Sequence, residues 1–371
     1  MTLDRRQFLT GVGAAGVVGV TGCTGGPGSD GDDTDDTDGT DADGTDGGSS
    51  LQVGMVYATG GLGDGSFNDQ AQQGLRDAEK EYGVDSQDIQ PDSVSDFEPA
   101  QQQFAESTDP DYDLVCCIGF LQEESLSNTA ENYPDQRFML VDEVVDSGNV
   151  ANYTFDEHEG SFLVGQLAGL LTTREFRAGA GSTDPESATV GFVGGVESGL
   201  IGKFEAGFTA GVGYADDDVE VVTNYVGAFD DPAGGREAAL SMYNDGADVV
   251  YHAAGNTGTG VFQAAQDQGR FALGVDRDQS VTEESYRDVI LASMVKRVDT
   301  AVFEAIGSVD AGEFAGGSEV SLGLEDEGIN VAYGQQLGSD IDAEVKDAVA
   351  EARREIIDGN VSVPTDPDDA R

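Results

Sequence analysis

Polar and charged side chains follow several short apolar runs that are predicted to be β-strands. Asp142, Asp276 and Lys296 each come directly after such a run, and Gly255 and Asn256 follow another. Ligands of open α/β sheets bind beyond the carboxyl ends of the strands, so these positions favour one common site. Carboxylates accept and an ammonium donates several hydrogen bonds, which suits a ligand with sugar hydroxyl groups. The residues therefore favour binding of a polar ligand, with a salt bridge as the alternative role for Lys296.

A glycine-rich turn lies between the first predicted strand, residues 53–57, and a predicted helix at residues 68–82. Such a turn exposes backbone N–H groups and a helix N-terminus to a polar ligand. Phe67 lies in this turn without an apolar neighbour in the sequence, and Asn68 follows it. Two interpretations of Phe67 stay open from these residues alone: it fills the local core, or it contacts a ligand.

Short apolar runs alternate with helix-length amphipathic segments from residue 51 onward, which is the pattern of parallel sheets with crossover helices. The run at 53–56 with its glycines and Phe67 is echoed by the run at 190–195 with Phe204. This weak internal repeat predicts two similar α/β lobes that face each other across a cleft. The predicted strands are residues 53–57, 114–118, 137–141, 189–193, 219–225, 248–252, 271–275 and 289–294, and the predicted helices include residues 99–107, 160–172, 202–213, 234–244 and 260–268.

The composition is strongly acidic along the whole chain. Its 371 residues include 72 Asp and Glu against 18 Lys and Arg, which gives a formal net charge of −54. At molar salt the Debye length falls to about 3 Å and screens this repulsion, so we interpret the charge as adaptation to a high-salt habitat. A nucleic-acid-binding protein would need a basic face, which this composition excludes. Cys116 and Cys117 are adjacent in a predicted buried strand and are expected to be core thiols.

The N-terminal residues 1–23 have the charged start, apolar middle and small-residue site of an export signal. Arg5-Arg6 resembles a twin-arginine signal, and the residues that end at Cys23 resemble a lipobox, in which the cysteine becomes the lipid-bearing mature N-terminus. A plain signal with a chance cysteine is the alternative. Residues 24–50 are almost entirely Gly, Asp, Ser and Thr, which predicts a disordered tether.

Six segments together resemble the basic membrane protein family of ABC-transporter substrate-binding lipoproteins, which includes the purine nucleoside receptors. They run in the family's order between about residues 53 and 334. Each segment alone is a weak signal, but the set is specific. The segments are GGLGDGSFND at 60–69, GSFLVGQLAGLLT at 160–172, VGFVGGVESGLIGKFEAGFTAGV at 190–212, the stretch at 229–265 that contains AAGNTGTG, GVDRDQ at 274–279 and SMVKRVDTAV at 293–302.

The resemblance implies an α/β fold of the type I periplasmic-binding-protein class, with two Rossmann-like lobes, a hinge and a nucleoside enclosed between the lobes. A purine nucleoside is the favoured ligand. In the family's pattern Phe67 would stack on the base with Asn68 beside it, and Asp142 would contact the base. Asp276 and Lys296 would contact the ribose.

The resemblance also implies a second stacking ring, which maps to Tyr251 on the strand before the AAGNTGTG loop, and a ligand contact at Gly255 in that loop. One departure concerns the base edge. Many relatives have Asp before the Gly-Gly of the first loop, whereas this chain has Ala58 followed by Thr59. The lost carboxylate would remove one acceptor, which leaves the base preference open.

The same resemblance implies a monomeric receptor that is anchored through Cys23 at the extracytoplasmic face of the cell membrane. It would deliver its ligand to an ABC permease and the associated ATPase, without a catalytic role, cofactor, metal or nucleic acid. The expected parts are lobe 1 at residues 51–155 and about 297–316, lobe 2 at about 156–296 and 317–358, and an acidic tail at 359–371.

Two rival functions remain. A cofactor-dependent enzyme is disfavoured because residues 255–260 lack the Lys-Ser/Thr pair of a phosphate loop and residues 191–195 miss the GxGxxG spacing. The only histidines, His158 and His252, belong to no Cys/His cluster or Ser/His/Asp order. Nucleoside hydrolysis by carboxylates stays open because Asp is abundant. A sugar receptor of the same fold is the other rival.

Overall fold

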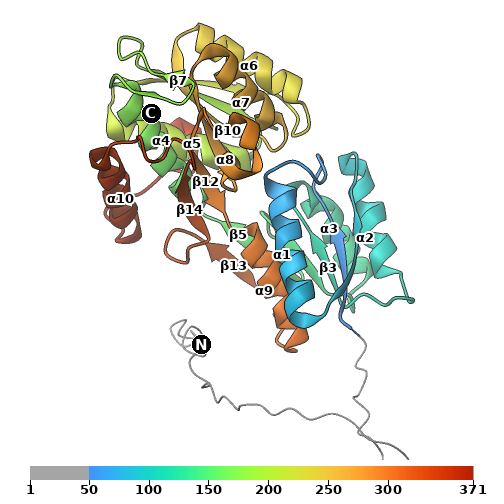
Figure 1. Ribbon diagram of the computed structural model, residues 1–371. Helices are drawn as coiled ribbons and strands as arrows, with labels where there is room; N and C mark the ends of the chain where they lie inside the picture. The colour runs from blue at the N-terminus through green and yellow to red at the C-terminus, as the bar shows by residue number, and fades with distance from the viewer. Residues whose placement is uncertain (1–49, 371) are drawn as a thin grey trace, which may run out of the picture. The chain divides into compact units, whose positions relative to one another are not determined.

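The computed structural model describes residues 50–370 (Figure 1). The export signal, the lipobox cysteine Cys23 and nearly all of the predicted tether lie outside the described residues. Two six-stranded sheets organise the described part of the chain, which confirms the predicted α/β fold with two lobes. Among residues 50–370, no helix combines the length and the apolar character that crossing a membrane requires.

Lobe 1 is built on a parallel sheet with the strand order β13-β5-β4-β3-β1-β2. Helices α1 and α9, which are distant in sequence, lie side by side on one face, and α2 and α3 cover the other (Figure 1). The elements are β1 (Gln52–Val56), α1 (Phe67–Tyr82), β2 (Asp85–Ile89), η2 (Val94–Asp96), α2 (Phe97–Ala105), β3 (Leu114–Cys117), η3 (Phe120–Gln122), α3 (Glu123–Asn132), β4 (Phe138–Val141), β5 (Val150–Phe155), α9 (Val298–Asp310) and β13 (Glu319–Leu322).

Lobe 2 repeats this plan with the strand order β14-β12-β11-β10-β8-β9, in which only β14 is antiparallel. The position of β8 in its sheet matches that of β1, so the predicted internal repeat corresponds to the two sheets. The elements are α4 (Glu157–Thr172), β6 (Arg177–Ala178), β7 (Gly181–Ser182), β8 (Thr189–Gly194), α5 (Gly199–Ala215), β9 (Glu220–Tyr225), α6 (Pro232–Asn244), β10 (Ala247–Ala253), α7 (Thr257–Gln268), β11 (Phe271–Asp276), α8 (Gln279–Thr282), η4 (Glu284–Tyr286), β12 (Ile290–Lys296), β14 (Ile329–Tyr333), α10 (Ala343–Ile357) and η5 (Pro367–Asp369).

The chain crosses between the two sheets three times within the described residues: between β5 and α4, between β12 and α9, and between β13 and β14. The third crossover differs from the expected boundary near residue 316, because β13 pairs in parallel with β5 of lobe 1. Of the four residues of β13 only Leu322 is buried, so this strand lacks the apolar run that marks the others in the sequence. The expected acidic tail packs on lobe 2, where Val361 and Val363 contact the core and η5 lies against α5.

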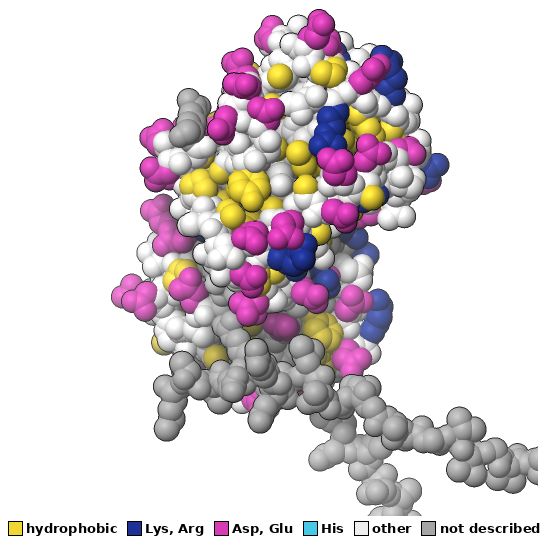
Figure 2. Space-filling model, turned by 90° about the vertical axis from the view of Figure 1, so that its left-hand side faces the viewer, with side chains coloured by type: hydrophobic (Ala, Val, Ile, Leu, Met, Phe, Trp, Pro, Cys, Tyr) yellow, Lys and Arg dark blue, Asp and Glu magenta, His cyan; other side chains and the backbone are white. Residues whose placement is uncertain are grey.

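The interior strands β3, β4, β8, β10 and β11 are buried along their whole length. β3 and β10 have no exposed residue, as expected of parallel strands that are covered by helices on both faces. Cys116 and Cys117 lie in β3 as free, buried thiols, which confirms the prediction for them. Acidic side chains are spread over the molecular face shown in Figure 2, where Lys and Arg are few.

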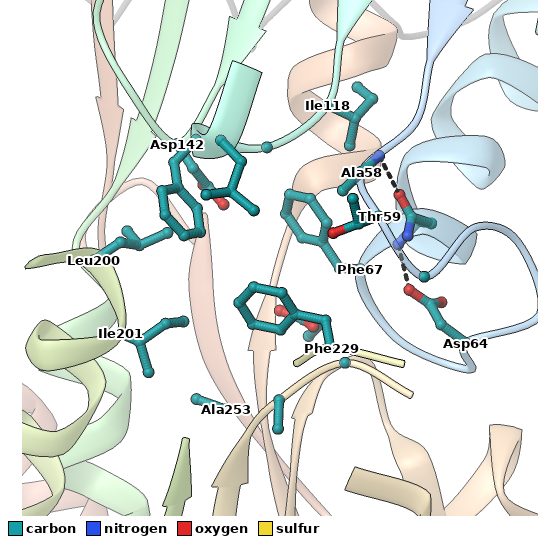
Figure 3. Close-up of a pocket in the computed structure, with 18 of the residues that line it drawn as sticks. Ala58, Thr59, Asp64, Phe67, Ile118, Asp142, Leu200, Ile201, Phe229 and Ala253 are labelled. Carbon is teal, nitrogen blue, oxygen red and sulfur yellow. Dashed lines mark hydrogen bonds between the residues drawn. The ribbon is translucent and has the colours of Figure 1, made fainter. Parts of the chain in front are cut away.

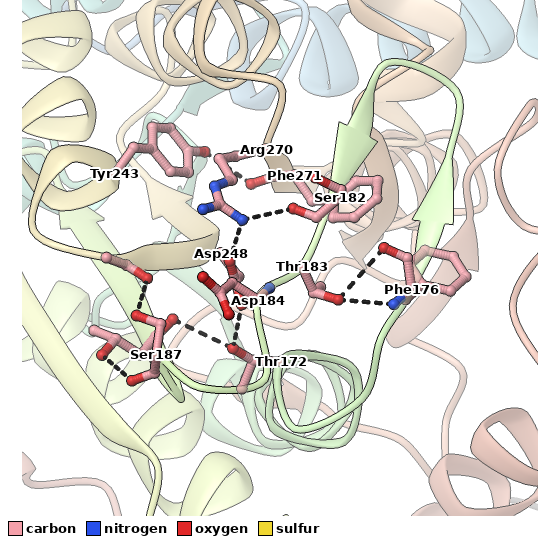
Figure 4. Close-up of polar contacts among 12 residues, drawn as sticks. Thr172, Phe176, Ser182, Thr183, Asp184, Ser187, Tyr243, Asp248, Arg270 and Phe271 are labelled. Carbon is pink, nitrogen blue, oxygen red and sulfur yellow. Dashed lines mark hydrogen bonds and ion pairs between the residues drawn. The ribbon is translucent and has the colours of Figure 1, made fainter.

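A polar network fixes the short β6–β7 hairpin to the start of β10 (Figure 4). The buried Asp248 carboxylate accepts hydrogen bonds from the Thr172 hydroxyl at 2.9 Å and from the Asp184 backbone N–H at 2.9 Å. Arg270 pairs with the same carboxylate at 2.6 Å and donates to the Ser182 carbonyl at 2.9 Å. These bonds stabilise the buried charge of Asp248. Asp248 lies near the start of β10, whereas the predicted ligand-binding residues lie at the other end of the strands.

Helices α4 and α5 approach closely through glycines. A Cβ added at Gly165 would lie 2.2 Å from the Phe208 carbonyl oxygen, and one at Gly211 would lie 1.9 Å from the Phe162 carbonyl oxygen. Real Cβ atoms do not come this close, so the helix backbones meet only because these positions lack side chains. This contact fixes the position of α5 against α4.

We expect Gly211→Ala to lower the free energy of unfolding by about 1–3 kcal/mol, because its methyl group must push the two helices apart. Gly213→Ala is the matched control on the same helix, since its added Cβ would approach no atom closer than 3.8 Å. The control should be neutral or stabilising by up to about 1 kcal/mol. Denaturant titration of the two variants at constant salt measures the difference, and equal midpoints would contradict the close-approach explanation.

Candidate functional site

A cavity lies between the carboxyl ends of the two sheets, lined by both lobes (Figure 3). The empty space between its walls is about 670 Å³, including open solvent at its mouth. Of the residues expected to bind a ligand, all but Tyr251 line it. These are Phe67, Asn68, Asp142, Gly255, Asp276 and Lys296.

The glycine-rich turn of lobe 1 is held by a buried aspartate that sequence reasoning did not single out. The Asp64 carboxylate accepts backbone N–H groups from Ser66 at 2.9 Å, Asn68 at 2.9 Å and Asp69 at 3.2 Å. Burial raises the pKa of Asp64 to about 6, and these three hydrogen bonds oppose the rise. The side-chain oxygen of Asn68 in turn accepts the Ala58 N–H at 2.9 Å (Figure 3). Asn68 therefore shapes the turn through its oxygen and can offer its amide NH₂ to a ligand.

Two phenylalanines project into the cavity from opposite lobes. Phe67 begins α1 in lobe 1, and Phe229 lies in the loop between β9 and α6 of lobe 2 (Figure 3). A Cβ at Gly195 would lie 2.4 Å from the Phe229 ring, so this glycine lets the ring lie flat on the backbone. Phe120 of lobe 1 meets Phe229 edge to face, with ring centroids 6.3 Å apart. The cavity thus offers two half-buried aromatic faces to a flat ligand.

Tyr251 does not line the cavity, in contrast to the expectation that it supplies the second stacking ring. It is fully buried in β10, where its ring lies 5.2 Å from Phe208 and 5.8 Å from Phe192, between centroids. Its hydroxyl lies 3.1 Å from that of Ser161. Side chains inside a covered strand point to the helical layers and only those at the strand end reach the cleft. Tyr251 is therefore part of the core, whereas the loop residue Phe229 lines the cavity.

Lys296 lies at the centre of the site with its side chain only 1% exposed. Its ammonium pairs with Asp142 of lobe 1 at 2.6 Å and with Glu157 at 3.0 Å. It also lies within 5.0–5.7 Å of three ring centroids, those of Phe155, Phe67 and Phe204. Burial works to lower the pKa of Lys296, but the surrounding carboxylates outweigh burial and raise it. The lysine is therefore held as an ammonium.

Asp142 and Asp276 occupy equivalent places at the ends of β4 and β11. Both have left-handed backbones, with φ of 74° and 64°, which is uncommon for residues other than glycine. Asp276 accepts a hydrogen bond from the Ser66 hydroxyl of lobe 1. Burial raises the pKa of Asp142 to about 7 against the opposing charge of Lys296, and burial also raises the pKa of Asp276. Backbone strain and shifted titration together are typical of functional sites.

The loop after β10 adds backbone to the cavity wall. Gly255 has a φ of 54° and Asn256 precedes α7, and both line the cavity. The first N–H of α7, that of Thr257, already donates to the Phe229 carbonyl at 3.1 Å. The loop thereby positions Phe229 beside the cavity.

The site combines flat apolar faces with carboxylates and one ammonium, and this combination suits a ligand with an aromatic ring and hydroxyl groups. Comparison with known proteins identifies the family. Residues 51–366 match the family model described as Bmp, ABC transporter substrate-binding protein PnrA-like. The chain belongs to this family. It is therefore an ABC transporter substrate-binding protein, as the six sequence motifs indicate.

Individual relatives of this substrate-binding protein agree with the family assignment. It is 36% identical over 334 residues to a CD4+ T-cell-stimulating antigen of Listeria innocua, covering 85% of this chain and 88% of the relative. It is 33% identical over 336 residues to the ABC transporter nucleoside-binding protein BmpA of Lactococcus lactis, covering 85% and 90%. The crystal structure of an ABC transporter solute-binding protein from Aeropyrum pernix superposes with a TM-score of 0.75 at 30% identity, covering 86% and 95%. The periplasmic-binding-protein fold is thus confirmed.

The raised pKa of Asp142 predicts how the stability of this substrate-binding protein depends on pH. The folded state holds the Asp142 proton more tightly than the unfolded chain, whose pKa is near 3.8, so proton binding stabilises the fold at low pH. That stabilisation is lost as the pH rises through the window that ends near 7. Between pH 5 and 8 at constant high salt, we expect the wild-type protein to lose about 1–3 kcal/mol more stability than Asp142→Asn.

Denaturant titration across this pH range measures how the free energy of unfolding of each protein changes with pH. This change with pH does not depend on any constant cost of the substitution. The control is Asp267→Asn, which removes an exposed carboxylate that pairs with Arg236 at 2.6 Å. The control should keep the wild-type slope. A slope in Asp142→Asn equal to that of the wild type would show that another group titrates.

Proposed function

We propose that this protein captures a nucleoside between its lobes and delivers it to the permease of an ABC importer, with a purine nucleoside as the favoured ligand. The observation that carries the proposal is the placement of Phe67 and Phe229 on opposite lobes of one cavity that also contains Asp276 and Lys296. A base can stack on the two rings while ribose hydroxyl groups bond to the carboxylate and the ammonium. The name of the Lactococcus relative supports the same ligand class.

Base recognition is proposed to involve Asp142, the Asn68 amide and Thr59, which all line the cavity. Ala58 also lines it, where many relatives of the family have a carboxylate, so the base edge meets a methyl group at this position. We propose that the base preference depends on Thr59 and Asp142 instead. Gly255 and Asn256 complete the proposed contacts from lobe 2.

The location is proposed from the N-terminal sequence and from the family. The residues that end at Cys23 fit a lipid anchor, and Arg5-Arg6 fits export through the twin-arginine route. Residues 24–50 would then tether a monomeric receptor to the extracytoplasmic face of the cell membrane, within reach of the permease and its ATPase. The net charge of −54 supports a halophilic source.

A sugar receptor is the second candidate, because sugar-binding proteins share this fold and sugars also stack on aromatic rings. The apolar walls favour the nucleoside. Ile118, Leu200 and Ile201 surround the space between Phe67 and Phe229 (Figure 3). A sugar ring placed there would have hydroxyl groups without hydrogen-bond partners, whereas the flat ring of a base would not.

Native mass spectrometry of the protein as purified tests the proposal directly. A retained ligand of nucleoside mass, displaced by added adenosine, is the expected result. A retained hexose, or no response to any nucleoside in calorimetry, would contradict it. Prolonged incubation with adenosine should return the nucleoside intact, since product in excess of the protein would instead indicate an enzyme.

Stacking predicts that Phe67→Ala and Phe229→Ala each raise the dissociation constant for a nucleoside more than tenfold at high salt, because one base–aromatic contact contributes about 1–3 kcal/mol. Tyr251→Phe is the control, since it keeps the buried ring and removes only a hydroxyl outside the cavity. It should bind within about twofold of the wild type. Calorimetry on the three variants decides, and an unchanged affinity in Phe67→Ala would remove the stacking role.

The ribose role predicts that Asp276→Ala weakens adenosine binding more than adenine binding. In the proposed arrangement the Asp276 carboxylate contacts the ribose and not the base, and a hydrogen bond to a charged group contributes about 1.5–3 kcal/mol. We therefore expect a loss of at least about tenfold for adenosine and a small change for adenine. Equal losses for the nucleoside and the free base would place Asp276 elsewhere on the ligand.

A further inference from the structure

Two of the four lysines of the chain meet at one buried carboxylate, that of Glu157. The Lys296 ammonium lies 3.0 Å from one carboxylate oxygen, and the Lys203 ammonium lies 4.0 Å from the other. The Glu157 side chain is 0% exposed. Most of the 72 Asp and Glu residues are expected at the surface. Glu157 differs from these, because its carboxylate is fully buried and two of the four lysines lie beside it.

The position of this ion pair in the chain is significant. Glu157 is the first residue of α4, directly after the first crossover between the lobes, and Lys296 is the last residue of β12, directly before the second. The pair therefore ties together two of the chain segments that join the lobes. In two-lobed binding proteins such segments act as the hinge.

Glu157 and Asp142 hold Lys296 from different places. Asp142 and Lys296 both line the cavity, whereas Glu157 does not. A ligand hydroxyl that approaches the ammonium must compete with Asp142, its partner from lobe 1 at 2.6 Å. It does not need to displace Glu157. The lysine can thus exchange one partner for a ligand and still keep a second ionic partner at the hinge.

We propose that Glu157 is a positioning residue that keeps the Lys296 ammonium in place at the cleft while a ligand replaces Asp142 as its partner. The proposal rests on the proposed function, because the ligand in it is a nucleoside. Glu157 acts through Lys296 and touches no ligand itself.

The charges of the site give the expected effect of removing the Glu157 carboxylate. Lys296 would lose its partner at the hinge and pair with Asp142 alone. Asp142 would also become more acidic, since the charge of Glu157 is one cause of its raised pKa. The stronger pair across the cleft would then compete with the ligand, so the affinity should fall although no ligand contact has been removed.

Calorimetry with adenosine on Glu157→Gln tests this effect. We expect the dissociation constant to rise more than tenfold, and Glu157→Asp, which restores a carboxylate, to recover part of the loss. Glu159→Gln is the matched control in the same first turn of α4, where Glu159 accepts the Leu324 N–H at 3.0 Å and makes no contact with Lys296. The control should bind within twofold of the wild type. Wild-type affinity in Glu157→Gln would overturn the proposal.

A second measurement needs no ligand. Lysine labelled with ¹³C at the ε carbon gives one signal for each of the four lysines, and Lys296→Arg assigns the signal of interest. We expect this signal to shift and its two protons to become equivalent in Glu157→Gln, because the ammonium gains freedom, and to stay unchanged in Glu159→Gln. A loss of affinity without any change at Lys296 would indicate a merely structural role and overturn the proposal.

The two measurements separate this proposal from the proposed function. If the wild-type protein binds no nucleoside but the Lys296 signal responds to Glu157→Gln, the ligand assignment fails and the positioning role stands. If Glu157→Gln does not fold, Glu157→Asp carries both readouts, since its shorter side chain must pull Lys296 toward the hinge or release it. An unchanged Lys296 signal and an unchanged affinity in that variant would overturn the proposal.

Discussion

The buried ammonium of Lys296 is the interaction on which the rest of the site depends. A charge removed from water is stable only if close partners replace its hydration. Asp142 and Glu157 pair with Lys296, and the charge of Asp276 also favours the ammonium. The three carboxylates come from both lobes, and Asp276 is more than a hundred residues from the other two in the sequence. The lysine therefore fixes how the strand ends of the two sheets meet. Burial raises the pKa of Asp142 to about 7 although Lys296 lowers it, and the negative charges of Glu157 and Asp276 add to the rise.

This charge cluster follows from the repeated architecture of the lobes. The two sheets have the same strand order, so the end of β4 in lobe 1 corresponds to the end of β11 in lobe 2, and each end carries an aspartate with a left-handed backbone. The ends of β5 and β12 correspond in the same way and carry Phe155 and Lys296, which contact each other at 5.0 Å. A pair of facing sheets thus brings equivalent strand ends together around one space. The strain at the two aspartates is tolerated because the surrounding strands and ion pairs over-determine their positions.

Much of this arrangement could be predicted from the sequence because strand ends are local signals. Asp142, Asp276 and Lys296 each follow an apolar run, and the topology of parallel sheets brings such ends to one edge. The remaining features are not local. Phe229 lies in a loop with no strand pattern, and the family resemblance places the second ring at the buried Tyr251 instead. Glu157 and Asp64 cannot be recognised in the sequence among 72 acidic residues. What sets them apart from the exposed acidic residues is their burial in the folded protein. The same holds for β13, whose alternation is too polar to show a strand.

The polar groups of the cleft already bond to one another across the lobes. Ser66 of lobe 1 donates to Asp276 of lobe 2, and Thr282 of lobe 2 donates to the Gly65 carbonyl at 2.9 Å. A ligand that enters must return equivalent bonds, since an unpaired buried group costs about 1–3 kcal/mol. A hydroxyl group both donates and accepts, so neighbouring hydroxyls can donate to a carboxylate and accept from the ammonium at once. A phosphate only accepts and would add negative charge beside three carboxylates. The polar groups of the cleft therefore favour an uncharged, hydroxyl-bearing ligand over a phosphorylated one.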